Sequence, residues 1–354
     1  MCVTSLAEKY SFETGVYRPP SEGGSASLLV RFTRNCPWNK CTFCGMYKGE
    51  TFEMRSAAEI KKDIDAMKAV WDHLKDLSWK MGQGGDISRK VIMTLVEQVP
   101  SLNHQPGLAM LYHWIVAGGK TAFIQDANSL IMKTDAFVEA LTYLRRQFPS
   151  IKRVTSYARA KTLVKKSAQE LAAIRQAGLD RLHLGLETGD DALLKKIRKG
   201  VTAEELIQGG QKAMQAGFQV SEYWMPGLGG KAMWENHARN TARVLSEINP
   251  HYIRSRPFHS WPDTPLADEL DQGELELLAP REQLTELKVM MNHLDVDAKV
   301  CFDHAANYWK NSDGGLLFSH DYEGYQFPAE KPHVLALIED GLSVDNVHPI
   351  RMNF

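Results

Sequence analysis

Three cysteines within one short segment are the side chains of this chain best suited to metal or redox chemistry. Cys36, Cys41 and Cys44 lie in RNCPWNKCTFCGMYKG, directly after an apolar run at residues 28–30. A [4Fe–4S] cluster normally takes four cysteine ligands, so a set of three leaves one iron open to bind another group. The segment has no obvious fourth ligand. The spacing therefore predicts a [4Fe–4S] cluster with one vacant coordination position.

Structural zinc and disulfide bonds are the alternatives for these cysteines. Cys41 and Cys44 have the spacing of a zinc knuckle, but Cys36 lies outside that pair and no nearby His or Cys completes a second pair. Disulfides fit less well, because the total of five cysteines is odd and the N-terminal residues do not read as a signal peptide. A non-catalytic iron–sulfur or zinc protein, with a binding or electron-transfer role, is therefore the alternative to an enzyme.

The cysteine segment resembles that of the radical S-adenosylmethionine (radical SAM) enzymes. In that superfamily three cysteines hold a [4Fe–4S] cluster, and the amine and carboxylate of SAM chelate the fourth iron. The commonest spacing there is C-x3-C-x2-C, whereas four residues separate Cys36 from Cys41 here. The resemblance implies that Phe43 packs near the adenine of SAM. It also implies that Gly45 and Met46 reach the adenine edge through main-chain groups.

Composition and charge limit the remaining possibilities. The chain has 354 residues, of which 44% are hydrophobic, so it can bury one large core or two modest ones. A formal net charge of −1 gives no general basic field, so we do not expect nucleic acid as a partner. No apolar run approaches the length of a membrane span, and we expect no membrane association and a cytoplasmic location.

Strand-like and helix-like runs alternate along the chain. Capping boxes at Ser167 with Glu170 and at Thr202 with Glu205 predict two helix starts. The expected strands are 27–32, 121–125, 153–158, 181–187, 219–225 and 252–258. Six strand–helix units predict an α/β fold with parallel strands and crossover helices. They suit the partial (β/α)6 TIM-like barrel of radical SAM enzymes, with a doubly wound sheet as the alternative.

The chain divides into three expected parts. Residues 1–26 form an N-terminal arm, and residues 27–262 form the partial barrel, with an insertion at 78–118. Residues 263–354 change in composition, and we expect them to form a C-terminal extension that closes the mouth of the barrel.

Polar residues at the C-terminal ends of the expected strands are candidate site residues, because parallel barrels carry their active sites there. Asp126 and Asn128 follow the second strand and could accept hydrogen bonds from the SAM ammonium; a capped turn is the alternative. Ser156 and Arg159 end the third, and the Arg159 guanidinium suits the SAM carboxylate.

The later strands supply further candidates. Glu187 ends the fourth strand in HLGLETG, a segment that resembles the coproporphyrinogen oxidase, elongator and methylthiotransferase subgroup, where this position hydrogen-bonds the SAM ribose. Met225 and Gly227 resemble the residues of the family that flank the adenine. Arg254 and Arg256 alternate in the sixth strand and face one side, so an anion on SAM or substrate, or a structural salt bridge, should neutralise them.

The resemblance implies an enzyme, either an oxidoreductase or a transferase. An electron donor such as flavodoxin or ferredoxin would reduce the cluster, SAM would be cleaved to a 5′-deoxyadenosyl radical, and that radical would remove a hydrogen atom from an unidentified substrate. Cys301 is the candidate to return a hydrogen atom, and a buried thiol that packs as a small hydrophobe is its alternative. An oxidoreductase on a doubly wound sheet would need a G-x-G-x-x-G turn, which the glycines at 227–230 do not form.

Overall fold

The structure is a computed structural model that describes residues 6–15, 27–307 and 309–344. It contains two compact units. The first comprises residues 1–35, 51–157 and 172–181, and the second comprises residues 36–50, 158–171 and 182–354. Three segments of the chain thus contribute to each unit, and the cysteine segment belongs to the second. Of the expected N-terminal arm, residues 1–5 and 16–26 lie outside the described residues.

Three parallel strands form the sheet of the first unit. They are β1 (Leu28–Arg31), β4 (Thr121–Gln125) and β5 (Arg153–Ala158). Leu28 pairs with Ala122, and Thr121 with Arg153, so β4 lies between the other two. The apolar residues of β1 are fully buried, as expected of a strand covered on both faces. A short antiparallel pair, β2 (Thr33–Arg34) with β3 (Glu53–Met54), follows β1.

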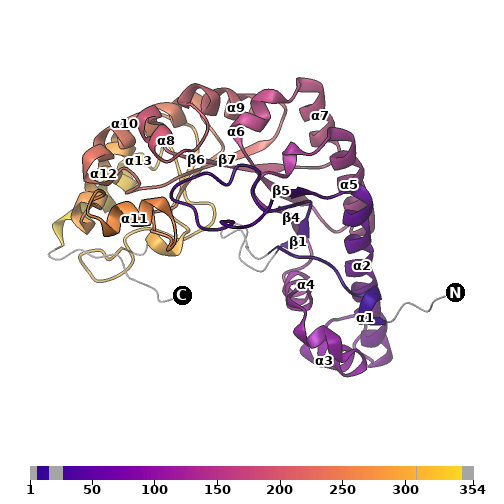
Figure 1. The fold of residues 1–354 in the computed structure, drawn as a ribbon. Helices are drawn as coiled ribbons and strands as arrows, with labels where there is room; N and C mark the ends of the chain where they lie inside the picture. The colour runs from indigo at the N-terminus through magenta and orange to yellow at the C-terminus, as the bar shows by residue number, and fades with distance from the viewer. Residues whose placement is uncertain (1–5, 16–26, 308, 345–354) are drawn as a thin grey trace. The chain divides into compact units, whose positions relative to one another are not determined.

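The helices of the first unit are α1 (Leu6–Lys9), α2 (Ala57–Lys80), α3 (Arg89–Gln98), η2 (Pro100–His104), α4 (Pro106–Val116), η3 (Ser129–Ile131) and α5 (Thr134–Gln147). Of these, α2 and α4 pack against β1. A capping box between Ser56 and Glu59 begins α2, which packs along α5 (Figure 1). α2 is 24 residues long and ends at Lys80. In the predicted insertion, α4 packs on β1, where the Leu29 amide donates to Met110 Sδ at 3.4 Å.

The second unit continues the strand–helix alternation. Its strands are β6 (Arg181–Glu187), β7 (Gln219–Trp224), β8 (Tyr252–Ser255), β9 (Lys299–Cys301) and β10 (Tyr325–Gln326). β7, β8 and β9 are parallel, and β10 is antiparallel to β9. One strand face joins the apolar core through Leu186, Trp224, Ile253 and Val300. Because side chains alternate along a strand, His183, Tyr223, Arg254 and Cys301 lie on the opposite face.

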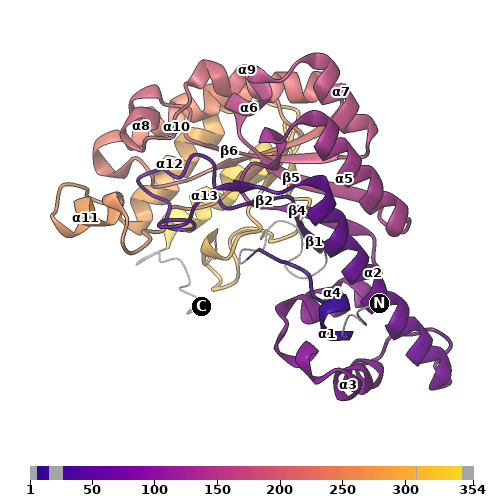
Figure 2. The ribbon, with the colours of Figure 1, turned by 45° about the vertical axis from the view of Figure 1, so that its right-hand side comes forward.

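The helices from residue 160 onward are α6 (Ala160–Lys165), α7 (Ala168–Gln176), α8 (Asp191–Lys196), α9 (Ala203–Gln215), α10 (Gly230–Ile248), α11 (Pro265–Asp271), α12 (Pro280–His293), η4 (Ala305–Asn307) and α13 (Lys331–Ser343). Of these, α6, α8, α9, α10, α12 and α13 contribute buried residues to that apolar core. Figure 2 shows α6 beside α9. Their backbones are close, because a Cβ at Gly209 would lie only 2.7 Å from the Cβ of Ala160. Both predicted capping boxes are present.

The predicted fold class is confirmed: the chain has an α/β fold with mostly parallel strands, in the strand–helix succession of a partial (β/α)6 barrel. Two details differ from expectation. The sixth strand ends at Ser255 rather than at residue 258, because Pro257 has no amide to donate to a ladder. The region after residue 262 adds β9 and β10 to the sheet. That this region closes the mouth of the barrel stays a prediction. None of the described helices combines the length and the apolar character that crossing a bilayer requires.

Candidate iron–sulfur and cofactor site

Asn39 turns the cysteine segment back on itself. Its φ of 45° lies in the left-handed region, which Asn tolerates better than most residues. Its backbone amide donates to Cys36 Sγ at 3.4 Å, and Lys48 Nζ donates to its carbonyl at 3.1 Å. The Asn39 side chain also donates to the carbonyl of Tyr47. The longer spacer between Cys36 and Cys41 is therefore an ordered turn.

The three thiols are free and partly exposed. Burial raises the pKa of Cys41, and Lys199 and Arg159 oppose that rise. Burial also raises the pKa of Cys44, which the Met46 amide lowers and the neighbouring cysteines raise. Among the described residues no three His, Cys, Asp or Glu side chains already stand as a metal-ligand group. The thiols still act on one another's pKa, and free cysteines with nearby cations fit the thiolate chemistry of an iron–sulfur cluster.

An apolar wall lies behind the cysteines. Phe43 is buried in a small cluster whose other members are Leu193, Ile197, Leu228, Leu266 and Leu275. Cys41, Cys44 and Met225 pack against this cluster. The side of the thiols that faces the wall is thereby shielded from water, which is the surrounding expected for a cluster and an adenine ring.

Trp38, in the spacer between the first two cysteines, anchors the segment to the turn after α8. Its Nε1 donates to the Arg198 carbonyl at 2.7 Å, and the Arg159 guanidinium lies 4.8 Å from its ring centroid. Gly200 has a φ of 71°, and a Cβ there would lie 2.2 Å from the Trp38 ring. Neither Trp38 nor Gly200 was a predicted site residue, although the aromatic residue inside the spacer was a signal.

A carboxylate and two cations lie beside Cys41. Glu187 Oε1 accepts a hydrogen bond from Lys199 Nζ at 2.7 Å, and Arg159 Nη2 donates to the Lys199 carbonyl at 2.6 Å. Burial alone would lower the pKa of Lys199, but Glu187 and Cys41 together outweigh burial, and the pKa is raised. Burial lowers the pKa of Arg159. Two predicted residues, Glu187 and Arg159, are thus brought together near a cysteine, and Lys199 is a third that the sequence analysis missed.

The backbone at Glu187 is unusual. Its φ of 63° is rare for a residue other than glycine and is typical of functional positions. The side chain of Glu187 needs the space that Gly185 leaves, because a Cβ at Gly185 would lie 2.3 Å from Glu187 Oε1. The fold therefore holds this carboxylate in a conformation that the local sequence alone does not favour.

The turn after β7 lies beside Glu187. The Met225 amide donates to the Glu187 carbonyl at 3.0 Å. Gly227 has a φ of 83° with open space around a Cβ, and its amide donates to Glu286 Oε2 at 2.6 Å. Burial raises the pKa of Glu286 to about 8.

Gly45 lies under Trp261, whose nearest side-chain atoms would be 3.1 Å from an added Cβ. Glu286 and Trp261 gave no sequence signal.

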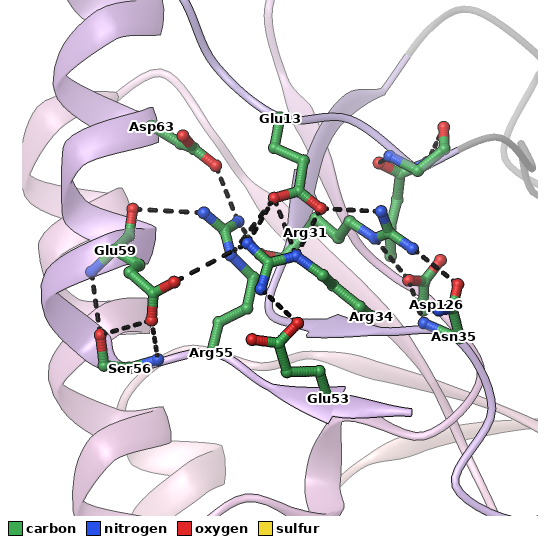
Figure 3. A network of polar contacts seen from close by, with 12 residues as sticks. Glu13, Arg31, Arg34, Asn35, Glu53, Arg55, Ser56, Glu59, Asp63 and Asp126 are labelled. Atoms are coloured by element: carbon green, nitrogen blue, oxygen red, sulfur yellow. Dashed lines mark hydrogen bonds and ion pairs between the residues drawn. The ribbon is translucent and has the colours of Figure 1, made fainter. Parts of the chain in front are cut away.

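The candidates after the second and third strands, Asp126, Asn128 and Ser156, lie in the first unit. Asp126 Oδ2 accepts from Arg31 Nε at 2.6 Å and from the Asn35 amide at 2.9 Å (Figure 3). Asn128 precedes η3 and is buried, and Ser156 Oγ donates to the Tyr157 carbonyl at 3.1 Å. Asp126 thus has a structural partner, and the SAM-binding roles of all three stay predictions.

Asp126 is part of a larger ionic network in the first unit. Figure 3 shows Glu13 between Arg31 and Arg34, with its carboxylate 2.7 Å from each guanidinium. Arg55 lies 2.7 Å from Asp63 and also donates to the Arg31 carbonyl at 2.7 Å. The network fixes the chain up to Asn35, the residue before Cys36, and the sequence analysis did not detect it.

The last two candidates are buried in the second unit. Arg254 is fully buried on β8, and its Nη1 lies 3.0 Å from Asp303 Oδ2. Burial raises the pKa of Cys301 to about 12, so its thiol stays protonated. Cys301 Sγ lies 3.7 Å from the Lys299 carbonyl and 3.6 Å from the Tyr322 carbonyl. Its role as a hydrogen-atom donor stays a prediction.

Comparison with known families indicates which proteins this chain resembles. The sequence model of the radical SAM superfamily matches residues 114–239, a span that contains Arg159, Glu187 and Lys199. Over this span the chain is similar to the radical SAM superfamily. The cysteine segment lies before the matched span, so the cluster ligands rest on the residues themselves.

Similar proteins include both curated sequences and solved structures of this superfamily. The heme chaperone HemW of Bacillus subtilis (strain 168) is 25% identical over 221 residues, which cover 58% of this chain and 58% of that protein. Coproporphyrinogen III oxidase (HemN) from Escherichia coli has a TM-score of 0.46 at 14% identity, over 75% of this chain and 51% of that one. Elp3 of the archaeon Methanocaldococcus infernus has a TM-score of 0.43 at 14% identity, over 60% of this chain and 51% of that one. The chain spans less than two thirds of each.

Proposed function

We propose that this protein is a radical SAM enzyme that holds a [4Fe–4S] cluster on Cys36, Cys41 and Cys44. The observation that carries the proposal is the grouping of three free thiols with Glu187, Lys199 and Arg159 in a chain similar to this superfamily. When bound, the cluster would supply the electron that cleaves SAM to methionine and a 5′-deoxyadenosyl radical, which removes a hydrogen atom from substrate.

The charged residues beside the thiols fit two tasks. A cluster held by three thiolates carries negative charge, and Lys199 and Arg159 oppose it, since both lower the pKa of Cys41. Arg159 has a fork of donors suited to a carboxylate, which fits the carboxylate of SAM. Glu187 presents acceptor oxygens at the end of β6, which fits the ribose hydroxyls of SAM.

The adenine fits the apolar wall. Phe43 and Met225 supply apolar surface there, and Gly45, Met46 and Gly227 supply backbone close to the thiols or to the β7 turn. Gly227 has no atoms within 4 Å of an added Cβ, so a ligand can approach its backbone. For the SAM ammonium we retain Asp126 and Asn128 as proposed acceptors, and Ser156 stays a proposed SAM-binding residue.

The reaction needs partners outside the chain. A one-electron reductant of the flavodoxin or ferredoxin kind fits the proposed cycle, and a cytoplasmic location fits an oxygen-sensitive cluster. The substrate would determine whether the enzyme is an oxidoreductase or a transferase, because fold and cofactor do not specify it.

The test is anaerobic turnover of SAM. The chain is reconstituted with iron and sulfide, reduced with dithionite and mixed with SAM, and 5′-deoxyadenosine is measured. We expect slow production by the wild type, none by Cys44→Ala, and unchanged production by Cys2→Ala, which removes a cysteine outside the segment. An intact, reduced cluster that neither binds nor cleaves SAM would refute the proposal and favour electron transfer. Stoichiometric zinc without iron would favour the zinc alternative.

A further inference from the structure

Two buried arginines share one carboxylate on the face of the second unit's sheet opposite the apolar core. Arg254 Nη1 lies 3.0 Å from Asp303 Oδ2, and Arg256 Nη1 lies 3.2 Å from Asp303 Oδ1. Arg254 is fully buried, and the side chains of Arg256 and Asp303 are 11% and 6% exposed. These three residues, called here the double-arginine cluster, join the end of β8 to the segment after β9.

The double-arginine cluster carries a net charge of +1. Guanidinium groups stay protonated in proteins, so the two arginines contribute two positive charges. Asp303 contributes one negative charge, because Arg256 and Arg254 overcome its burial and lower its pKa. Cys301 and His304 do not supply the missing charge, because burial raises the pKa of Cys301 to about 12, and burial followed by Arg256 lowers that of His304 to about 4. The nearby carboxylate of Glu323 pairs with Lys299. An unbalanced buried charge is costly unless an anion completes it.

The same arginines retain unused hydrogen-bond donors. Within the described part of the chain, Nε and Nη2 of Arg254 and Nε of Arg256 are buried and have no hydrogen-bond partner. Buried polar atoms are nearly always satisfied in native proteins, and exceptions often mark the place of an absent ligand. The N–H donors without partners therefore belong to the same two arginines that give the cluster its excess positive charge.

Aromatic rings hold both guanidiniums in place. Arg254 lies 4.2 Å from the ring centroid of Tyr322 and 5.0 Å from that of Tyr252, and Arg256 lies 4.9 Å from that of Tyr223. Stacking on an aromatic face fixes a guanidinium without consuming its in-plane N–H donors. The donors are thus pre-oriented, which reduces the entropy lost when an anion binds.

We propose that the double-arginine cluster binds a carboxylate group of the substrate. One monoanion brings the cluster to neutrality, whereas a phosphate dianion would leave it with net negative charge. The inference rests on the proposed function for the existence of a substrate, and it assigns to Arg254 a substrate contact rather than a contact with SAM. Arg256 retains some exposure, which gives the anion a side from which to approach.

The test measures anion binding to the full-length chain, with acetate as the carboxylate probe and inorganic phosphate as the second probe. Acetate binding is followed by saturation-transfer NMR. Arg256→Gln removes one of the two charges, and we expect it to weaken acetate binding about tenfold or more. Asp303→Asn removes the internal competitor for the arginines, and we expect it to tighten acetate binding at least about threefold. Arg239→Gln, at an exposed arginine of α10, is the matched control and should bind as the wild type does.

The two variants predict opposite changes, so misfolding cannot imitate the expected result. If Arg256→Gln does not fold, as judged by circular dichroism, Asp303→Asn alone decides. Acetate binding that is absent from the wild type, or that Asp303→Asn fails to tighten, would overturn the inference. Phosphate binding tighter than acetate binding would overturn the assignment to a carboxylate. These titrations do not require the iron–sulfur cluster. A failure of SAM cleavage can therefore be distinguished from a failure of anion binding.

Discussion

Trp38 Nε1 donates a hydrogen bond to the carbonyl of Arg198 at 2.7 Å, which ties the spacer of the cysteine segment to the turn that carries Lys199. A second bond, from the Thr42 amide to the Ile197 carbonyl at 3.0 Å, joins the same two segments. The cysteines and the Glu187–Lys199 pair are therefore held as one structural element, although more than 150 residues separate Trp38 from Arg198.

The fit of Trp38 against Gly200 gives the first prediction. Gly200→Ala places a Cβ 2.2 Å from the Trp38 ring, so it should lower the free energy of unfolding by about 2–4 kcal/mol, from backbone strain plus overpacking. Gly49→Ala is the matched control, because Gly49 also has a positive φ but has no atoms near its Cβ. It should cost only about 1 kcal/mol. Both variants are measured by urea unfolding and by iron content after reconstitution. Equal losses of stability in the two variants would contradict a clash between residue 200 and Trp38.

The pair between Lys199 and Glu187 gives the second prediction. Lys199→Met leaves Glu187 without its cation in a largely buried position, so we expect a loss of about 3 kcal/mol in the free energy of unfolding. SAM binding should also weaken, because the carboxylate is no longer held at the end of β6. Lys196→Met removes a more exposed lysine that pairs with Glu269, and it should cost at most about 1 kcal/mol. Thermal unfolding and SAM titration measure both variants, and losses for Lys199→Met no greater than those for Lys196→Met would contradict the prediction.

The buried carboxyl of Glu286 gives a pH-dependent prediction. Its folded-state pKa of about 8 exceeds its ordinary value of 4.5, so the unfolded chain releases this proton first as pH rises. Stability should therefore fall between about pH 4.5 and pH 8 and level off above. Glu286→Gln keeps an acceptor for the Gly227 amide and removes the titration. Its stability relative to the wild type should rise by a few kcal/mol from pH 5 to pH 8.

Denaturant unfolding at several pH values measures the effect of Glu286. Glu274→Gln, at an exposed glutamate, is the control and should run parallel to the wild type across the same range. A Glu286→Gln profile that is also parallel to the wild type would show that the carboxyl is not buried as described.

Asp126 allows a structural and a ligand-binding role to be separated. If the ion pair with Arg31 is its main contribution, Asp126→Asn should lower the free energy of unfolding by about 1–3 kcal/mol and leave the KM for SAM unchanged. If Asp126 binds the SAM ammonium, the KM should rise as well. Glu53→Gln removes an exposed carboxylate of the same network and should cost less than about 1 kcal/mol. Equal effects of the two variants on stability would argue against a structural role.

The sequence by itself predicted the helices and strands and the spacing of the cysteines. Strand alternation, helix periodicity and capping boxes are local, because they depend on residues a few positions apart, and they predicted the α/β fold with parallel strands. The spacing of Cys36, Cys41 and Cys44 was equally local. Positions at strand ends indicated Arg159 and Glu187 because parallel strands share the polarity of their ends.

Only the tertiary structure decided which distant side chains meet. Lys199 pairs with Glu187 across a helix and two turns, and Asp303 pairs with Arg254 because β9 adds to β8, a pairing that no local pattern predicted. Whether a buried charge is balanced also depends on every element packed around it. Pairing partners and charge balance are properties of the packed chain, whereas propensity and spacing are properties of neighbours in the sequence.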